Sequence, residues 1–154
     1  MLMSEQMIAD LSKATDLNHV ILRYFNVAGS DPDGKIGQST KNATLLIKIA
    51  AEVAVGMRDK LLIFGIDYPT SDGPGIRNYI HVSDLAAAHI NALDYLQNGA
   101  PINVEEMPRR AGDPPELISV ADKIHSTIGW QPQYDDLNLI VKTSLAWEKK
   151  LLAL

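Results

Sequence analysis

The decisive stretch of the sequence is HVILRYF, which occupies residues 19–25. Its apolar side chains follow one another without the polar–apolar alternation of a strand that has one face in water. We therefore expect both faces of this stretch to be buried, as in a central strand of a parallel sheet covered by helices. This expectation favours an α/β fold.

Helices and short strands are predicted to alternate around this stretch. Helical periodicity predicts helices over residues 1–14, 42–56, 84–97, 119–128 and from Asp135 or Asp136 to about Leu152. Shorter apolar runs predict extended segments at residues 61–64, 77–82 and 101–106, and a loop at 108–115. Ser83 is expected to cap the third helix, and Gly129 to end the fourth just before a Trp130 anchor.

Two of these helices carry further expectations. The helix at 42–56 has apolar residues that are predicted to form its buried face: Leu45, Leu46, Ile49, Ala50 and Val53. The helix at 1–14 starts without a capping residue, because the chain begins inside it, and this is unusual for a complete domain.

Composition excludes several classes of protein. The chain has 154 residues, no cysteine and a net charge of −5, so disulfide scaffolds, thiolate metal sites and nonspecific nucleic-acid binding are not expected. No apolar run approaches the roughly 20 residues of a membrane span, and the first residues lack the pattern of a signal peptide. We expect one domain, or one domain with an appendage, located in the cytoplasm and with no membrane or nucleic-acid partner.

The common motifs of nucleotide enzymes are absent from the sequence. Gly73-Pro74-Gly75 lacks the third glycine of a dinucleotide-binding loop, and no helix follows it. There is no Walker loop, nucleophile elbow or His-Glu-x-x-His motif. The four histidines are predicted to be partly buried and hydrogen-bonded rather than metal ligands: His19, His81, His89 and His125.

Arginines provide a weak indication of nucleotide binding. Arg77 and Arg110 could hold a diphosphate through their guanidinium groups, and Asp113 could accept hydrogen bonds from a ribose. Ordinary surface ion pairs explain the same residues, and spacing alone favours that explanation.

Five segments together resemble the UDP-glucose 4-epimerase family of the extended short-chain dehydrogenase/reductase superfamily. They are LRYFNVAG (22–29), IFGIDYPTSDG (63–73), RNYIHVSDLA (77–86), PRRAGD (108–113) and GWQP (129–132). The resemblance implies the C-terminal part of such an enzyme, with a partial Rossmann sheet and a small α/β substrate-binding domain. Residues 1–26 would be the remnant of the Rossmann half, and residues 27–154 the substrate-binding domain, with an apparent internal deletion near 100–101.

The resemblance also implies an activity. Members interconvert UDP-glucose and UDP-galactose in galactose metabolism, with NAD as cofactor and a Tyr-x-x-x-Lys pair for proton transfer. Carried over by position, Tyr24 would lie by the nicotinamide of NAD. The remaining positions would bind the UDP-sugar: Asn26 at the substrate phosphate, Phe64 at the uracil, Arg77 and Arg110 at the diphosphate, and Asp113 at the ribose, with Tyr79 as a further substrate-binding residue.

The sequence departs from that family in ways that matter for activity. None of its five tyrosines has a lysine four residues later, and residues 2–6 resemble the family just after the catalytic lysine. No catalytic residue is therefore assigned to this chain. Asn78, Leu45 and Leu117 also depart from the family at positions near the nucleotide and sugar.

Three hypotheses remain open from the sequence. The chain could be a truncated epimerase that is inactive alone, a non-catalytic UDP-sugar-binding module, or a docking partner of a full-length epimerase. In each case, a buried-type strand without neighbours predicts homo-oligomers or association through exposed sheet surfaces.

Overall fold

The computed structural model describes residues 2–98, 116–117 and 120–153 of the chain. Five helices and four short strands are found there, which confirms the predicted α/β class. The elements in chain order are α1 (Leu2–Ala14), β1 (Asn26–Ala28), α2 (Leu46–Ala54), β2 (Ile76–Arg77), β3 (Tyr79–His81), α3 (Val82–Gln97), β4 (Glu116–Leu117), α4 (Asp122–Ile128) and α5 (Leu137–Leu152). The predicted strand at 101–106 and the loop at 108–115 lie outside the described residues.

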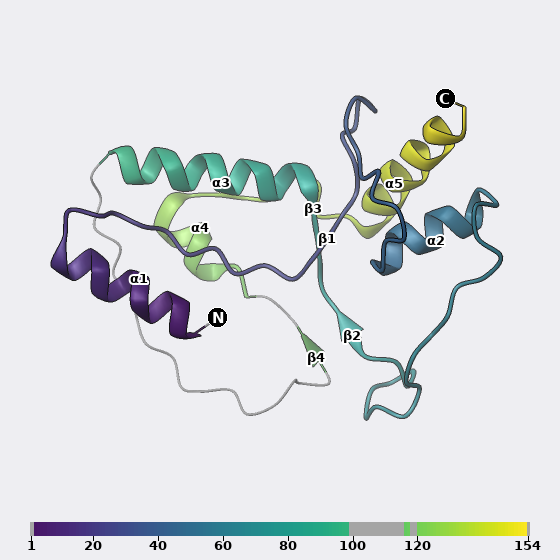
Figure 1. The fold of residues 1–154 in the computed structure, drawn as a ribbon, viewed down its shortest axis with the longest axis horizontal. Helices are drawn as coiled ribbons and strands as arrows, with labels where there is room; N and C mark the ends of the chain where they lie inside the picture. The colour runs from purple at the N-terminus through teal and green to yellow at the C-terminus, as the bar shows by residue number, and fades with distance from the viewer. Residues whose placement is uncertain (1, 99–115, 118–119, 154) are drawn as a thin grey trace.

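The molecule is elongated, with helices at both ends and β1 and β3 between them (Figure 1). Helices α1, α3 and α4 occupy one end, and α2 and α5 pack together at the other. The strands form two parallel pairs, β1 with β3 and β2 with β4. Parallel pairing was expected, and the pairs are short. Strand β3 and Arg77 of β2 fall within the extended segment predicted at 77–82, which is confirmed, whereas β1 and β4 lie in segments that were not predicted as strands.

Two predicted strands are wrong. Residues 19–25 and 61–64 have no regular secondary structure, and pairing begins only at Asn26. Tyr24 and Phe25 are half exposed instead of buried. A strand needs a neighbour for its backbone groups, and the described residues provide none for these two stretches.

The buried face of α2 also differs from the predicted one. Lys48 and Glu52 are buried, and Lys48 pairs with both Glu52 and the nearly inaccessible Glu148 of α5. Arg58 also pairs with Glu52, so the four charges balance. Leu45, Leu46 and Ala50 of the predicted stripe are exposed, and only Ile49 and Val53 are half-buried. The buried face of α2 therefore consists of Ile47, Lys48, Ala51 and Glu52, and its charged half is paired with a residue 100 positions away.

Helix α3 begins earlier than predicted and has a different cap. Its N-cap is His81, whose ring nitrogen accepts a hydrogen bond from the backbone N–H of Ser83, so Ser83 is not the cap. Ala88 and Ala92 are buried, as the apolar stripe indicated, whereas His89 is exposed.

The signals at the C-terminal helices are largely confirmed. Gly129 ends α4 with a left-handed φ of 66°, although α4 begins later than predicted. Trp130 is buried, and its indole N–H donates to the Asp84 carbonyl at 3.2 Å. Asp136, rather than Asp135, caps α5 by accepting from the Asn138 N–H at 2.8 Å. Within the part of the chain that is described, no helix is long and apolar enough to cross a membrane.

Candidate functional site

Strands β1, β2 and β3 bring together three of the residues that the resemblance assigned to the UDP-sugar. The parallel register places Asn26 opposite Tyr79. The Asn26 side-chain N–H₂ donates to the Asn78 carbonyl at 3.0 Å, which fixes its orientation at the junction of β2 and β3. Arg77 lies immediately before this junction, at the end of β2.

Arg77 presents a cation at this junction. Its side chain is exposed, and its recorded hydrogen bond is to the neighbouring Ile76 carbonyl at 2.9 Å. Burial raises the pKa of Tyr79, and the positive charge of Arg77 acts in the opposite direction. The Tyr79 hydroxyl therefore stays protonated at neutral pH and can donate a hydrogen bond, but it is not poised to act as a base. A cation beside a hydroxyl donor and an amide suits an anionic ligand.

The other sequence-predicted residues are not brought into this cluster by any described contact. The Tyr24 ring is 46% exposed and meets the His89 ring of α3 edge-on at 5.9 Å. Phe64 is 82% exposed in the irregular segment before β2. Arg110 and Asp113 lie outside the described residues. Leu117 of β4 is in register with Arg77, so the chain returns beside the cluster.

A buried network that sequence reasoning missed supports the end of β1. His81 is only 1% exposed, and its ring accepts from the Ser83 N–H at 3.1 Å and contacts the Thr143 hydroxyl at 3.2 Å. Burial lowers the pKa of His81, and the nearby Asp84 opposes this shift. Since the nitrogen facing Ser83 accepts, the other one carries the hydrogen and donates to Thr143.

Loop residues after β1 join the same network. Ser30 donates through its hydroxyl to the Thr143 carbonyl at 2.6 Å, and the Gly29 N–H donates to the Ser144 hydroxyl at 3.0 Å. Gly29 has a φ of 85°, and a Cβ there would lie 2.3 Å from the His81 ring. The sequence signal was a glycine directly after β1, whose close approach to a residue 52 positions away could not be foreseen.

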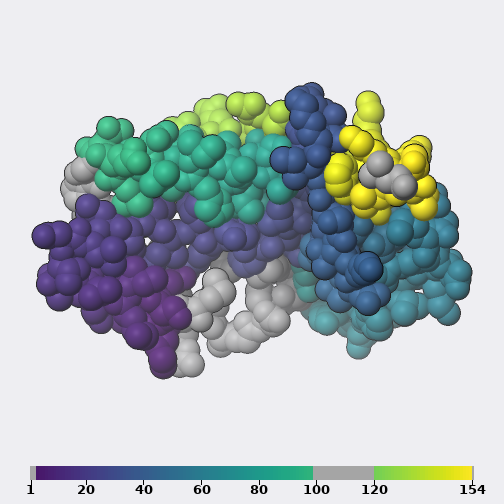
Figure 2. All heavy atoms as spheres, turned by 45° about the horizontal axis from the view of Figure 1, so that its top comes forward, coloured from purple at the N-terminus to yellow at the C-terminus, as the bar shows by residue number. Residues whose placement is uncertain are grey.

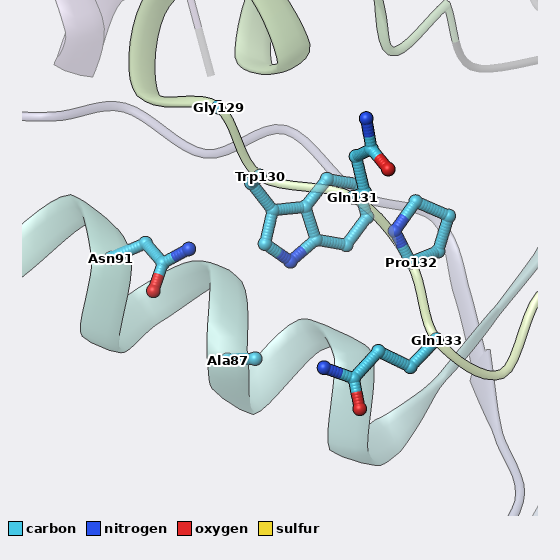
Figure 3. Close-up of a pocket in the computed structure, with 7 residues that line it drawn as sticks. All are labelled: Ala87, Asn91, Gly129, Trp130, Gln131, Pro132 and Gln133. Carbon is cyan, nitrogen blue, oxygen red and sulfur yellow. The ribbon is translucent and has the colours of Figure 1, made fainter.

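A cavity of about 420 Å³ lies elsewhere, between α3 and the turn before α5 (Figure 3). Asp84, buried at the start of α3, holds this turn by accepting from the N–H groups of Gln133 and Tyr134 at 2.8 and 2.9 Å. The lining residues are Ala87, Asn91, Gly129, Trp130, Gln131, Pro132 and Gln133. None of the sequence-predicted site residues lines it.

The described residues do not form a cradle for NAD. Gly73-Pro74-Gly75 leads into strand β2 rather than into a helix, so it cannot direct helix N–H groups at a pyrophosphate. Among the described residues, no group of three His, Asp or Glu side chains could hold a metal.

Comparison with known proteins shows the class. A protein-family model described as the NAD dependent epimerase/dehydratase family matches residues 2–104. The chain therefore belongs to this NAD-dependent family. The UDP-glucose 4-epimerase of Azospirillum brasilense is 45% identical over 178 residues, which cover 97% of this chain and 51% of the relative.

Solved structures of epimerases share the fold. One is the UDP-glucose 4-epimerase of Stenotrophomonas maltophila, crystallised with NAD and formylated UDP-arabinopyranose. It matches this chain with a TM-score of 0.83 at 30% identity, and the match covers 99% of this chain and 54% of the epimerase chain. The Bifidobacterium longum enzyme, with NAD+ and UDP, has a TM-score of 0.80 at 30% identity, with coverages of 97% and 53%. The chain spans about half the length of the curated relatives it matches and corresponds to the C-terminal part of the epimerase.

Proposed function

We propose that this chain is the UDP-sugar-binding part of a UDP-glucose 4-epimerase, acting on UDP-glucose and UDP-galactose in galactose metabolism. The observation that carries the proposal is the cluster of Asn26, Arg77 and Tyr79 on neighbouring strands, in which Arg77 is exposed and the other two are half-buried. Its relatives include structures that contain UDP or a UDP-sugar. In this chain, Arg77 would hold the diphosphate, and Tyr79 and Asn26 would donate hydrogen bonds beside it.

We propose further that the chain does not epimerise a sugar alone. Proton transfer needs a positioned base, and no Tyr-x-x-x-Lys pair occurs in the 154 residues. Because the described residues do not cradle NAD, the cofactor site would have to be completed by residues outside them. The roles of Phe64 at the uracil, Tyr24 at the nicotinamide, Arg110 at the diphosphate and Asp113 at the ribose remain part of this proposal.

The domain arrangement is proposed on the same basis. Residues 1–26 would belong to the Rossmann half and residues 27–154 to the substrate-binding domain. The alignment with the Azospirillum brasilense relative covers 178 residues, more than the 154 of this chain, so the relative has residues within the aligned region that this chain lacks. This difference supports an internal deletion, which the sequence pattern places near residues 100–101.

Calorimetric titration with UDP and UDP-glucose tests the proposal. Wild type is expected to bind both, and Arg77→Ala to weaken binding by about tenfold or more, because a charged hydrogen bond contributes roughly 1.5–3 kcal/mol. Lys123→Ala, at an exposed site on α4, makes the same charge change and should leave binding unaltered. Equal loss in both variants, or no binding by wild type, would contradict the proposal.

A second assay separates the incomplete enzyme from a non-catalytic module. With NAD added, the chain alone should give no C4 epimerisation, and measurable turnover would contradict its proposed inactivity. The alternative, a UDP-sugar-binding module without catalytic function, is favoured only by the missing Tyr-x-x-x-Lys pair. Binding of UDP without turnover under any assay condition would support this module.

A further inference from the structure

The hydroxyl of Thr143, on helix α5, is buried where strands β1 and β3 end. It donates a hydrogen bond to the Ile140 carbonyl of its own helix at 3.0 Å. It also accepts two hydrogen bonds, from the Ser30 N–H just after β1 at 3.3 Å and from the His81 ring at the end of β3 at 3.2 Å. A hydroxyl has one hydrogen to donate and two lone pairs, so the capacity of this one is fully used.

The loop that follows β1 lies against the same turn of α5 (Figures 1 and 2). The Ser30 hydroxyl donates to the Thr143 carbonyl at 2.6 Å, and the hydroxyl of the adjacent Ser144 accepts from the Gly29 N–H at 3.0 Å. A Cβ at Gly29 would collide with the His81 ring, so glycine permits this close approach. Thr143 and Ser144 together therefore form a clamp, the α5 clamp, that holds the ends of both strands.

The α5 clamp holds the register on which the candidate site depends. Ala28 of β1 is in register with His81 of β3, and Asn26 is in register with Tyr79 two residues earlier. At roughly 3.3 Å per residue, the clamp acts about 7 Å from the Asn26–Tyr79 pair. The paired strands are only 3 residues long, so few backbone hydrogen bonds fix their register. A slip by one residue would turn Asn26 to the opposite face of the strand pair.

We propose that Thr143 is a positioning residue for the UDP-sugar: its hydroxyl holds β1 and β3 in the register that places Asn26 beside Tyr79. Because this hydroxyl has no hydrogen-bonding capacity left, it acts through Asn26 rather than on the ligand. Ser144 supports the same register through Gly29. The proposal rests on the proposed function, since it concerns the same UDP-sugar site.

Calorimetric titration with UDP-glucose compares Thr143→Val with Thr143→Ser. Valine keeps the shape of threonine but leaves the N–H groups of Ser30 and His81 without their acceptor, so UDP-glucose binding should weaken about fivefold, the equivalent of one neutral hydrogen bond. Serine keeps the hydroxyl and should restore the wild-type affinity. Ser144→Ala removes only the acceptor of the Gly29 N–H and is the milder variant if valine prevents folding, with an expected loss of about threefold.

Two controls separate positioning from a general loss of stability. Gly129→Ala strains the left-handed end of α4 without touching the α5 clamp, and it should leave the affinity unchanged while circular dichroism shows that each variant is folded. A double-mutant cycle with Asn26→Ala tests the route of the effect. If Thr143 acts through Asn26, adding Thr143→Val to Asn26→Ala should weaken binding by less than about twofold further.

Three results would overturn the positioning role: unchanged affinity in folded Thr143→Val, the full loss persisting in the Asn26→Ala background, or an equal loss in Gly129→Ala. Each of them leaves the proposed function standing, because wild type still binds UDP-glucose. A wild-type chain that does not bind UDP-glucose would instead overturn the proposed function itself, so the two failures are distinguishable.

Discussion

His81 joins the end of β3, the start of α3 and the side of α5 through one neutral ring. Its folded pKa is lowered by burial, so the folded state binds fewer protons than the unfolded state, whose pKa is about 6.5. Stability is therefore fully present above pH 6.5 and is lost as the pH falls from there through the folded pKa.

We expect the free energy of unfolding to fall below pH 6.5 by at most about 1.4 kcal/mol per pH unit from this group. Urea denaturation between pH 5 and pH 8 measures it. His81→Asn keeps an N-cap acceptor but does not titrate, so it should flatten the dependence, although it lowers stability at every pH. His89→Asn, on the exposed side of α3, is the control, and an equal effect of the two variants would refute the assignment.

The buried ion pair between Lys48 and Glu148 gives the second prediction at the residue scale. Either charge left alone in the contact between α2 and α5 is poorly solvated, so Lys48→Met is expected to cost about 3–5 kcal/mol of unfolding free energy. The double variant Lys48→Met with Glu148→Leu should recover much of that loss, because an apolar pair replaces the ionic one while Glu52 keeps Arg58. Urea unfolding of both single variants and the double variant checks this, and a simple sum of the single losses would contradict it.

At the scale of an element, the end of α4 depends on the left-handed backbone conformation of Gly129, whose effect can be separated from side-chain packing. Gly129 has a φ of 66°, and a Cβ there would meet no atom within 4 Å. Gly129→Ala should therefore lower the free energy of unfolding by about 1–2 kcal/mol through backbone strain alone. Gly129→Asn should retain most of the stability, since asparagine tolerates the left-handed region. Thermal and urea unfolding compare the two, and equal losses would show that side-chain packing is responsible.

The elements that could be predicted from the sequence are those fixed by nearby residues. Helix α1 follows from its periodicity, the end of α4 from Gly129, and the start of α5 from Asp136. The strand expected at residues 19–25 depended on neighbouring strands that no local pattern reports. The buried face of α2 depended on Glu148, which is distant in sequence.

The candidate site was predicted to a similar extent. Residue type alone indicated Arg77, whereas Asn26 and Tyr79 followed only from the family resemblance. Their proximity is a consequence of the register of β1 and β3, which the sequence does not specify. The support from His81, Gly29 and Thr143 was missed because it joins three distant segments.

At the scale of the whole molecule, exposed apolar side chains are expected to promote self-association. Leu61, Leu62, Ile63, Phe64 and Ile66 form a short run without proline or a strong net charge, and all are exposed. Such a run favours intermolecular strand pairing. We propose that it contributes to homo-oligomers of the chain.

Light scattering as a function of concentration tests this contribution. Ile63, which is 64% exposed, is the suitable position, because Ile63→Lys places a charge in the run without disturbing the core. The variant should shift association to severalfold higher concentration and leave the melting temperature unchanged. Ile36→Lys adds the same charge at a side chain that is 74% exposed but isolated in the loop before α2, so it separates the effect of the run from that of net charge. If both variants suppress association equally, net charge is the cause, whereas a clean monomer in wild type would remove the run from consideration.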